Sequence, residues 1–217
     1  MTTARRQVEL LEKNRPRQER AKRTYESILA AAAELLVEVG VERISTNLIA
    51  ERAGITVPAL YRYFPNKYAV INALGAQLMD RQNQVFQEWF DSHVPGGGPE
   101  QLLSNIYELL LQTYNVTLAQ HGGLEISQAL RAVGPLQELR LTSHNLMAGQ
   151  FALILSEMFQ ESASEELTRR ARVTIETGYS LVEMALENPR EQAEEILQES
   201  ALMLQAYWAG LLDSRTD

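Results

Sequence analysis

The stretch ISTNLIAERAGITVPALYRYFPNK, residues 44–67, decides how the N-terminal part of this chain folds. It predicts a short helix, a tight turn at Gly54 and a second short helix, because glycine adopts positive φ without steric cost. The apolar side chains that would hold the two helices at a fixed angle are Ile49, Ala53, Ile55, Leu60 and Phe64. Such a pair is a helix-turn-helix, whose second helix enters the major groove of DNA.

The residues on either side of this turn predict where the helices begin and end. Apolar residues at helical spacing predict a preceding helix over 24–39, which Gly40 ends in the position that glycine favours. Thr46 is expected to cap the next helix and Thr56 the one after it, over 57–64. Threonine suits both places because its hydroxyl accepts a hydrogen bond from the free N–H groups of a helix start.

Three segments carry a resemblance to a known family: ILAAAAELLVEVGVERIST at 28–46, IAERAGI at 49–55 and ALYRYFPNKYAVI at 59–71. With them, residues 20–73 resemble the DNA-binding domain of the TetR family of bacterial transcriptional regulators. The resemblance implies an all-α protein in which a larger helical domain, here residues 74–217, binds a ligand and forms a dimer.

The second helix of the motif carries most of the residues predicted to contact DNA. Arg62 suits guanine, because its guanidinium can donate two hydrogen bonds to O6 and N7, whereas apolar residues at the helix start can pack against thymine methyl groups. The resemblance further implies that Tyr61, Tyr63, Lys67 and Thr46 contact backbone phosphates. The full predicted set is Thr46, Thr56, Val57, Pro58, Ala59, Tyr61, Arg62, Tyr63 and Lys67. The alternative is that the tyrosines only pack and Arg62 is a surface charge.

The formal charge of the chain is divided unevenly. Residues 1–67 contain twelve Lys and Arg and eight Glu, a balance of +4, whereas residues 68–217 carry −12 and the whole chain −8. A basic N-terminal part favours binding to a polyanion, and the asymmetry helps to orient the approach to DNA. The acidic part is explained equally by a solvated surface.

Composition is that of a soluble globular protein. The chain has 217 residues, of which 45% are hydrophobic and 22% charged, and it has no cysteine. No apolar run approaches the roughly 20 residues that span a bilayer, and the N-terminus lacks the apolar segment of a signal peptide. We therefore expect a cytoplasmic protein without disulfides and without a membrane partner.

Residues 1–19 are basic and polar, and they contain Pro16, which breaks any long helix. We predict a largely disordered arm over this range. Two roles stay open for it: an arm that follows the phosphates or the minor groove of DNA, or a solvated tail with no fixed partner.

Helical periodicity continues to the C-terminus, and no segment alternates with period two for long. Further helices are predicted from about residue 66 to past residue 89, and over 100–118, 124–132, 135–160, 165–186 and 190–211. Glycine and proline separate them, most clearly in PGGGP at 95–99. With the three N-terminal helices these make about nine, and the predicted fold class is all-α.

The last two helices predict a surface for dimerisation. Their residues at four-three spacing are Leu167, Ala171, Thr174, Gly178, Leu181, Ala185, Leu197, Leu204, Trp208 and Leu211. Two such helices from each of two chains would form a four-helix interface. The alternative is that these stripes cover the chain's own core. Each helix also has a second apolar face, made of Ile175, Tyr179 and Val182 on one and Ile196, Met203 and Tyr207 on the other.

The middle of the chain is predicted to hold a small-molecule effector among large apolar side chains. The candidate residues are Trp89, Tyr107, Tyr114, Arg131, His144, Met147, Phe151 and Tyr179. If Arg131 and His144 point inward, they can bind a carboxylate or phenolate in an otherwise apolar pocket. Core packing explains each aromatic residue taken alone, and exposure explains the two polar ones.

The signatures of an enzyme are lacking. His93, His121 and His144 do not have the spacing of metal ligands, and the glycines at 96–98 lack the Lys and Ser/Thr of a phosphate-binding loop. We therefore predict no catalytic residue, no metal and no cofactor.

Together these features predict a homodimeric DNA-binding repressor that leaves a near-palindromic operator when a small, largely apolar effector binds. Two alternatives stay open: a constitutive DNA-binding dimer without an effector, and a helical module that binds another protein.

Overall fold

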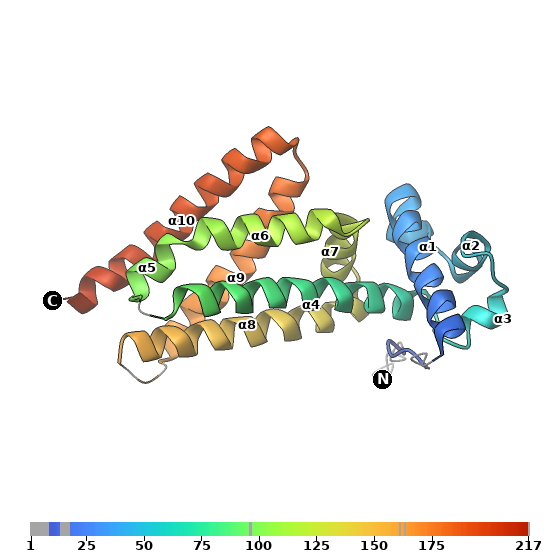
Figure 1. Ribbon diagram of the computed structural model, residues 1–217, viewed down its shortest axis with the longest axis horizontal. Coiled ribbons are helices and arrows are strands. Elements are labelled where there is room, and N and C mark those ends of the chain that lie inside the picture. The colour runs from blue at the N-terminus through green and yellow to red at the C-terminus, as the bar shows by residue number, and fades with distance from the viewer. Residues whose placement is uncertain (1–8, 14–17, 96, 161, 163, 217) are drawn as a thin grey trace, which may run out of the picture. The chain divides into compact units, whose positions relative to one another are not determined.

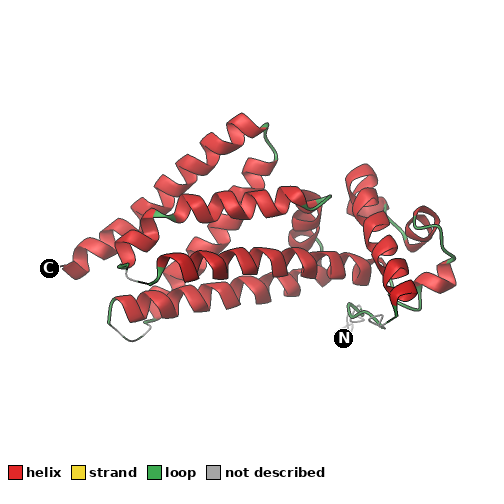
Figure 2. Cartoon of the chain, in the orientation of Figure 1, coloured by secondary structure: helices red, strands yellow, loops and turns green. Residues whose placement is uncertain are grey.

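The computed structural model describes residues 9–13, 18–95, 97–160, 162 and 164–216, and in this part of the chain all regular structure is helical, as predicted (Figure 1, Figure 2). The helices are α1 (Glu19–Arg43), α2 (Thr46–Arg52), α3 (Val57–Leu60), α4 (Lys67–His93), α5 (Pro99–Ser104), α6 (Ile106–Ala119), α7 (Gly123–Ala132), α8 (Gln137–Met158), α9 (Glu165–Leu186) and α10 (Arg190–Thr216). A short 3₁₀-helix, η1 (Gly134–Leu136), precedes α8.

The described residues contain one more α-helix than predicted, because two helices occupy the range 100–118. The chain leaves α-helical geometry between α5 and α6 at Asn105, where φ is −94° and ψ is 13°. The side chain of Asn105 donates to the Gln101 carbonyl over 2.7 Å, so it competes with the backbone for that acceptor. Its own carbonyl accepts a hydrogen bond of 3.0 Å from Trp89 Nε1.

Contacts group the chain into two compact units. The first consists of Met1–Met79 and Gln120–Arg140, and the second of Asp80–Ala119 and Leu141–Asp217. The first unit therefore takes in residues 74–79 and 120–140, which were predicted to belong to the C-terminal domain.

The core of the first unit forms around the helix-turn-helix. Leu60 and Phe64, predicted to face inward, are both 0% exposed. Tyr25 of α1 stacks on the Phe64 ring with a centroid distance of 5.2 Å. The first helix, the turn and the start of α4 thus share one hydrophobic core.

Helix α3 ends at Leu60, four residues earlier than the predicted 57–64. After Leu60 the backbone hydrogen bonds are mixed. Arg62 N bonds to Ala59 O over 3.2 Å and Tyr63 N to Leu60 O over 2.9 Å, both of the i→i−3 type, whereas Phe64 N bonds to Leu60 O over 3.0 Å in the i→i−4 pattern. Pro65 explains why the helix cannot continue, because a proline disfavours helical geometry at the preceding residue.

The predicted helix ends are correct at Gly40 and Thr56 and wrong at Thr46. Gly40 adopts φ 74° and ends the regular part of α1, and the Thr56 side chain accepts from Ala59 N at the start of α3. The residue that caps α2 is Ser45, whose hydroxyl accepts from Leu48 N over 3.2 Å. Thr46 is the first helical residue instead, which frees its hydroxyl for another contact.

Helix α7 packs in the same core as the helix-turn-helix, through Ile126, Ala129 and Leu130. It approaches α4 so closely that a Cβ atom on Gly75 would lie 2.7 Å from Leu130 Cδ2. A side chain at residue 75 would therefore have to displace Leu130 in this helix crossing.

The second unit is a helical layer structure around a core of apolar and aromatic residues (Figure 1). Helices α9 and α10 pack against each other and against α6. Within this unit α4 and α8 run side by side, since Phe86 contacts Phe151 with a centroid distance of 6.3 Å and Ser143 Oγ bonds to Asn83 Oδ1 over 3.0 Å.

Two glycine substitutions test the close crossing of α4 and α7. Gly75→Ala gains helix propensity but forces Leu130 to move, and overpacking of this kind costs about 1–3 kcal/mol. Gly149→Ala in α8 meets no atom within 4 Å, so it should raise the free energy of unfolding by about 0.5–1 kcal/mol. We expect urea denaturation to give a lower free energy of unfolding for Gly75→Ala than for Gly149→Ala. Equal stabilisation by both substitutions would contradict the close crossing of α4 and α7.

Candidate DNA interface and interior cavity

The helix-turn-helix is held on α1 by an ion-pair network at Arg52. Its guanidinium bonds Glu38 through both terminal nitrogens, at 2.7 and 2.8 Å, and Glu34 at 3.0 Å. Hydrogen bonds to Glu38 and then Glu34 raise the pKa of Arg52, and the bond from Arg52 lowers the pKa of the Glu38 carboxyl. Since Arg52 lies on α2 and both glutamates on α1, the network links the surfaces of two helices that already share one apolar core.

Helix α3 and the turn after it present the predicted DNA-contacting side chains outward. Pro58, Tyr61 and Arg62 are exposed, and Val57, Ala59 and Tyr63 are half-buried. Burial of Leu60 and Phe64 produces this separation, because it commits one side of the short helix to the core.

Two residues predicted to contact phosphates lie together. The Tyr61 hydroxyl is 3.2 Å from Thr46 Oγ1, and Tyr61 is 42% exposed. The contact joins the start of α2 to the end of α3, and the hydroxyl that accepts in this bond keeps its own proton for a phosphate oxygen. Tyr63 instead packs edge-on against Tyr25, with a centroid distance of 6.3 Å.

Lys67 has a structural partner that the sequence did not reveal. Its ammonium donates to Val41 O over 3.0 Å and to Glu42 O over 3.3 Å, so it satisfies carbonyls at the end of α1. An ammonium has three donors, and one remains for a phosphate.

Part of the predicted N-terminal arm is docked on the first unit. Lys13 N donates to Tyr63 O over 2.7 Å, and Asn66 Nδ2 donates to Glu9 O over 2.8 Å. Leu10 packs against the core, which differs from the disorder expected for this stretch. The remaining residues of the arm, 1–8 and 14–17, lie outside the described part of the chain.

Arg20 and Arg23, which are not among the predicted DNA-contacting residues, are exposed on the first turns of α1. They help to line a groove between α1 and the turn before α3, together with Glu19, Thr24, Ser27, Ala53 and Ile55. The basic composition of the N-terminal segment was the signal that could have found them, once the start of α1 was placed at Glu19.

The second unit contains a cavity between helices α4, α6, α8, α9 and α10. Its lining residues are Phe86, Trp89, Ile106, Leu109, Leu110, Thr113, Phe151, Thr174, Ile175, Gly178, Tyr179, Val182 and Leu204. A water-sized molecule can be centred in only about 40 Å³ of it, although all unfilled space, including that open to solvent, is about 500 Å³. The cavity therefore has little free room for a ligand unless its side chains move.

Three of the eight predicted ligand-binding residues line this cavity: Trp89, Phe151 and Tyr179. Tyr114 and Met147 lie in the surrounding core, and Tyr107 packs against that core. His144 is behind the wall, and Arg131 belongs to the first unit, so these two do not jointly face the cavity. The missed lining residues on α4 and α6 follow helical spacing, which alone does not distinguish a cavity wall from packed core.

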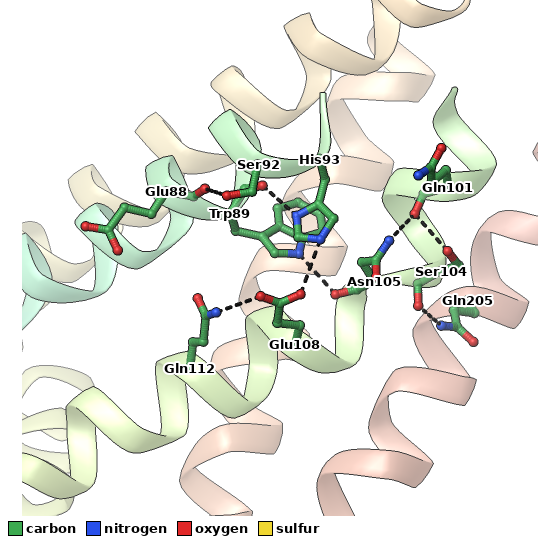
Figure 3. A network of polar contacts seen from close by, with 10 residues as sticks. All are labelled: Glu88, Trp89, Ser92, His93, Gln101, Ser104, Asn105, Glu108, Gln112 and Gln205. Carbon is green, nitrogen blue, oxygen red and sulfur yellow. Dashed lines mark hydrogen bonds and ion pairs between the residues drawn. The ribbon is translucent and has the colours of Figure 1, made fainter. Parts of the chain in front are cut away.

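A polar network fixes the Trp89 wall of the cavity (Figure 3). Besides the bond from Trp89 Nε1 to Asn105 O, His93 Nδ1 lies 2.8 Å from Trp89 O and His93 Nε2 lies 3.2 Å from Glu108 Oε2. Gln205 Nε2 of α10 donates to Ser104 O over 3.0 Å. These bonds hold α4, α5, α6 and α10 together at this end of the second unit.

The residues predicted for dimerisation lie in the protomer's own core. Leu167, Ala171, Ala185, Leu197 and Trp208 are each at most 1% exposed, and of the ten only Leu181 is half-buried. This burial supports the alternative given above, that the two stripes cover the chain's own core. Side chains open to a partner are instead on the outer face of the same helices, where Met184 and Met203 are exposed.

Within the described ranges, no helix is long and apolar enough to cross a membrane. The same residues contain no group of three His, Cys, Asp or Glu side chains that could hold a metal ion.

Comparisons with known proteins assign both parts of the chain to one family. The model described as bacterial regulatory proteins, tetR family, matches residues 28–74, and the model described as tetracyclin repressor-like, C-terminal domain, matches residues 125–210.

Curated relatives match only the N-terminal part. The chain is 43% identical over 54 residues to tetracycline repressor protein class C of Escherichia coli, which covers 25% of each protein. It is 33% identical over 72 residues to an uncharacterized HTH-type transcriptional regulator of Mycobacterium bovis, covering 33% of this chain and 37% of that one. The match thus spans about a quarter of the first relative's length.

Solved structures match over most of the chain. A TetR-family transcriptional regulator from Streptomyces coelicolor has a TM-score of 0.54 and 25% identity, covering 86% of this chain and 98% of that one. A TetR-like regulator from Rhodococcus sp. RHA1 has a TM-score of 0.59, 19% identity and coverage of 90% and 99%, and it shows the shared fold.

The fold and the outward residues of α3 define a DNA-binding transcriptional regulator of the helix-turn-helix class, not an enzyme. The chain belongs to the TetR family, as the resemblance predicted.

The internal contacts of Lys67 can be tested by a pair of lysine substitutions. Lys67→Ala removes a half-buried ammonium from two carbonyls, so the free energy of unfolding should fall by about 1–2 kcal/mol. Lys22→Ala removes only an exposed ion pair with Glu19 and should cost about 0.5 kcal/mol or less. Urea titration followed by circular dichroism compares the two, and equal losses would mean that Lys67 does not hold the end of α1.

Proposed function

We propose that the protein is a homodimeric cytoplasmic repressor, released from a near-palindromic operator by a small, largely apolar effector. The observation that carries the DNA part is the outward display of Pro58, Tyr61 and Arg62 above the buried Leu60 and Phe64. In this proposal Arg62 reads a base, while the paired hydroxyls of Tyr61 and Thr46 hold a phosphate.

The dimer is proposed to form through the outer faces of α9 and α10. A groove between them is lined by Leu181, Met184, Gln192, Glu195, Ile196, Glu199, Ser200 and Met203. Its occupant is a second copy of the chain, because a palindromic site requires two recognition helices related by two-fold symmetry. Such a dimer would place them about 34 Å apart, one turn of DNA.

The effector is proposed to bind in the cavity of the second unit. It can change DNA affinity only by binding more tightly to the arrangement that fits DNA poorly. A coupling of about 1–3 kcal/mol would weaken operator binding roughly 5–150-fold.

The small free space favours one alternative, a constitutive DNA-binding dimer. Only about 40 Å³ accepts the centre of a water-sized molecule, so an effector must displace side chains to enter. If no ligand class changes both thermal stability and DNA release, the constitutive reading prevails.

DNA recognition predicts different effects for Arg62 and Tyr61. Arg62→Ala should relax preference at one base pair of each half-site, at a cost of about 1–3 kcal/mol there. Tyr61→Phe keeps the ring and loses the hydroxyl, so binding should weaken alike for all sequences. Gel shifts with DNA flanking the gene and with single-base variants measure both.

A charge-matched control for these shifts is Arg190→Ala, which removes an exposed arginine of α10. If no specific complex forms at low salt, the regulator proposal is wrong. If Arg62→Ala weakens binding equally for all DNA sequences, Arg62 does not contact a base.

The dimer surface predicts that Met203→Glu, on the outer face of α10, yields a monomer, because two charges would be buried unpaired at the interface. The control is Leu146→Glu on α8, whose wild-type side chain is similarly exposed, at 55% against 48% for Met203. Sedimentation velocity measures the oligomeric state of both. A monomer from Leu146→Glu alone would assign the interface to α8 instead.

A further inference from the structure

The hydroxyl of Tyr179 is a hydrogen-bond donor that is still available at the cavity wall. The other polar side chains of the lining are Thr113 and Thr174, whose hydroxyls donate to Leu109 O over 2.8 Å and Arg170 O over 2.9 Å. Thr174 Oγ1 also accepts from Trp208 Nε1 over 2.9 Å. Tyr179, in contrast, makes no hydrogen bond to any residue that the structure describes.

In the part of the chain that the structure describes, no charged side chain lines the cavity, and two ionisable groups beside Tyr179 have partners of their own. The His144 ring stacks on Tyr179 at 4.2 Å and 6°, and its Nδ1 is 3.2 Å from Glu176 Oε2. The other oxygen of Glu176 accepts from Arg172 over 2.7 Å. An anionic ligand beside Tyr179 would therefore find no cationic side chain among the lining residues to pair with.

The phenol is held in its donating form. Burial raises the pKa of Tyr179 above its ordinary value, and the Glu176 carboxylate raises it further, because both disfavour a phenolate. Tyr179 is half-buried, and its neutral phenol at the apolar wall can donate its one proton to a neutral acceptor.

We propose that this cavity binds an uncharged, mostly apolar molecule with one carbonyl-type oxygen, which accepts a hydrogen bond from the Tyr179 hydroxyl. This molecule would be the effector. Only its role in regulation rests on the proposed function. This molecule replaces the predicted carboxylate or phenolate ligand of Arg131 and His144. The small free space suits a slender, unbranched chain, which needs the least displacement of the walls.

The test compares three probes that share one alkyl chain: 2-heptanone, heptanoate and heptane. Both tryptophans of the chain are reporters, because Trp89 lines the cavity and Trp208 bonds to its Thr174. Intrinsic fluorescence of the full chain at pH 7, without DNA, gives the dissociation constants. We expect wild type to bind 2-heptanone at least tenfold more tightly than heptanoate.

Tyr179→Phe isolates the hydroxyl. It should weaken 2-heptanone binding about tenfold, the effect of one lost hydrogen bond, and leave heptane unchanged. The control Tyr107→Phe removes the same atom from a tyrosine that packs against the core without lining the cavity, and it should change neither.

Three outcomes would overturn the proposal: tighter binding of heptanoate, equal 2-heptanone binding by wild type and Tyr179→Phe, or no binding of any probe. None of them bears on DNA binding, which the gel shifts measure separately. Conversely, a ketone that binds through Tyr179 without releasing DNA would keep the site and remove its regulatory role.

Discussion

The DNA-facing surface depends on the burial of Leu60 and Phe64. A helix of four residues cannot be stable alone, because helix nucleation is costly and few hydrogen bonds repay it. Helix α3 therefore takes its direction from the two side chains that enter the core, from the stacking of Tyr25 on Phe64 and from the Arg52 network on α1. These contacts therefore set the positions of the outward residues of the motif.

The same core includes α7, far along the chain from the helix-turn-helix. Gly75 and Leu130 pack closely where α7 crosses α4, and packed interiors transmit displacement. Residues 120–122 connect α6, which lines the cavity, to α7. Under the proposed function, a displacement of α6 by the effector would reach α7 through this short connection.

Helices α9 and α10 have an inner face that closes the protomer's core and an outer face that is proposed to contact a second copy of the chain. Their inner stripes, from Leu167 to Leu211, close the protomer's core and form part of the cavity wall. A residue that is already buried cannot contribute the same surface to a partner, so the proposed dimer uses the outer face. The outer groove carries glutamates at its rim, as expected of a surface that is solvated before it pairs.

The sequence by itself determined the elements whose cause is local. The turn at Gly54, the end of α1 at Gly40, the cap at Thr56 and the inward Leu60 and Phe64 follow from φ preference, hydroxyl chemistry and periodicity. Only the tertiary structure decided which stripe of α9 and α10 faces inward, that Lys67 caps the end of α1, and that Tyr179 rather than Arg131 reaches the cavity. Helical spacing identifies a face but not its neighbour, because the partner of each face comes from residues far away in the chain.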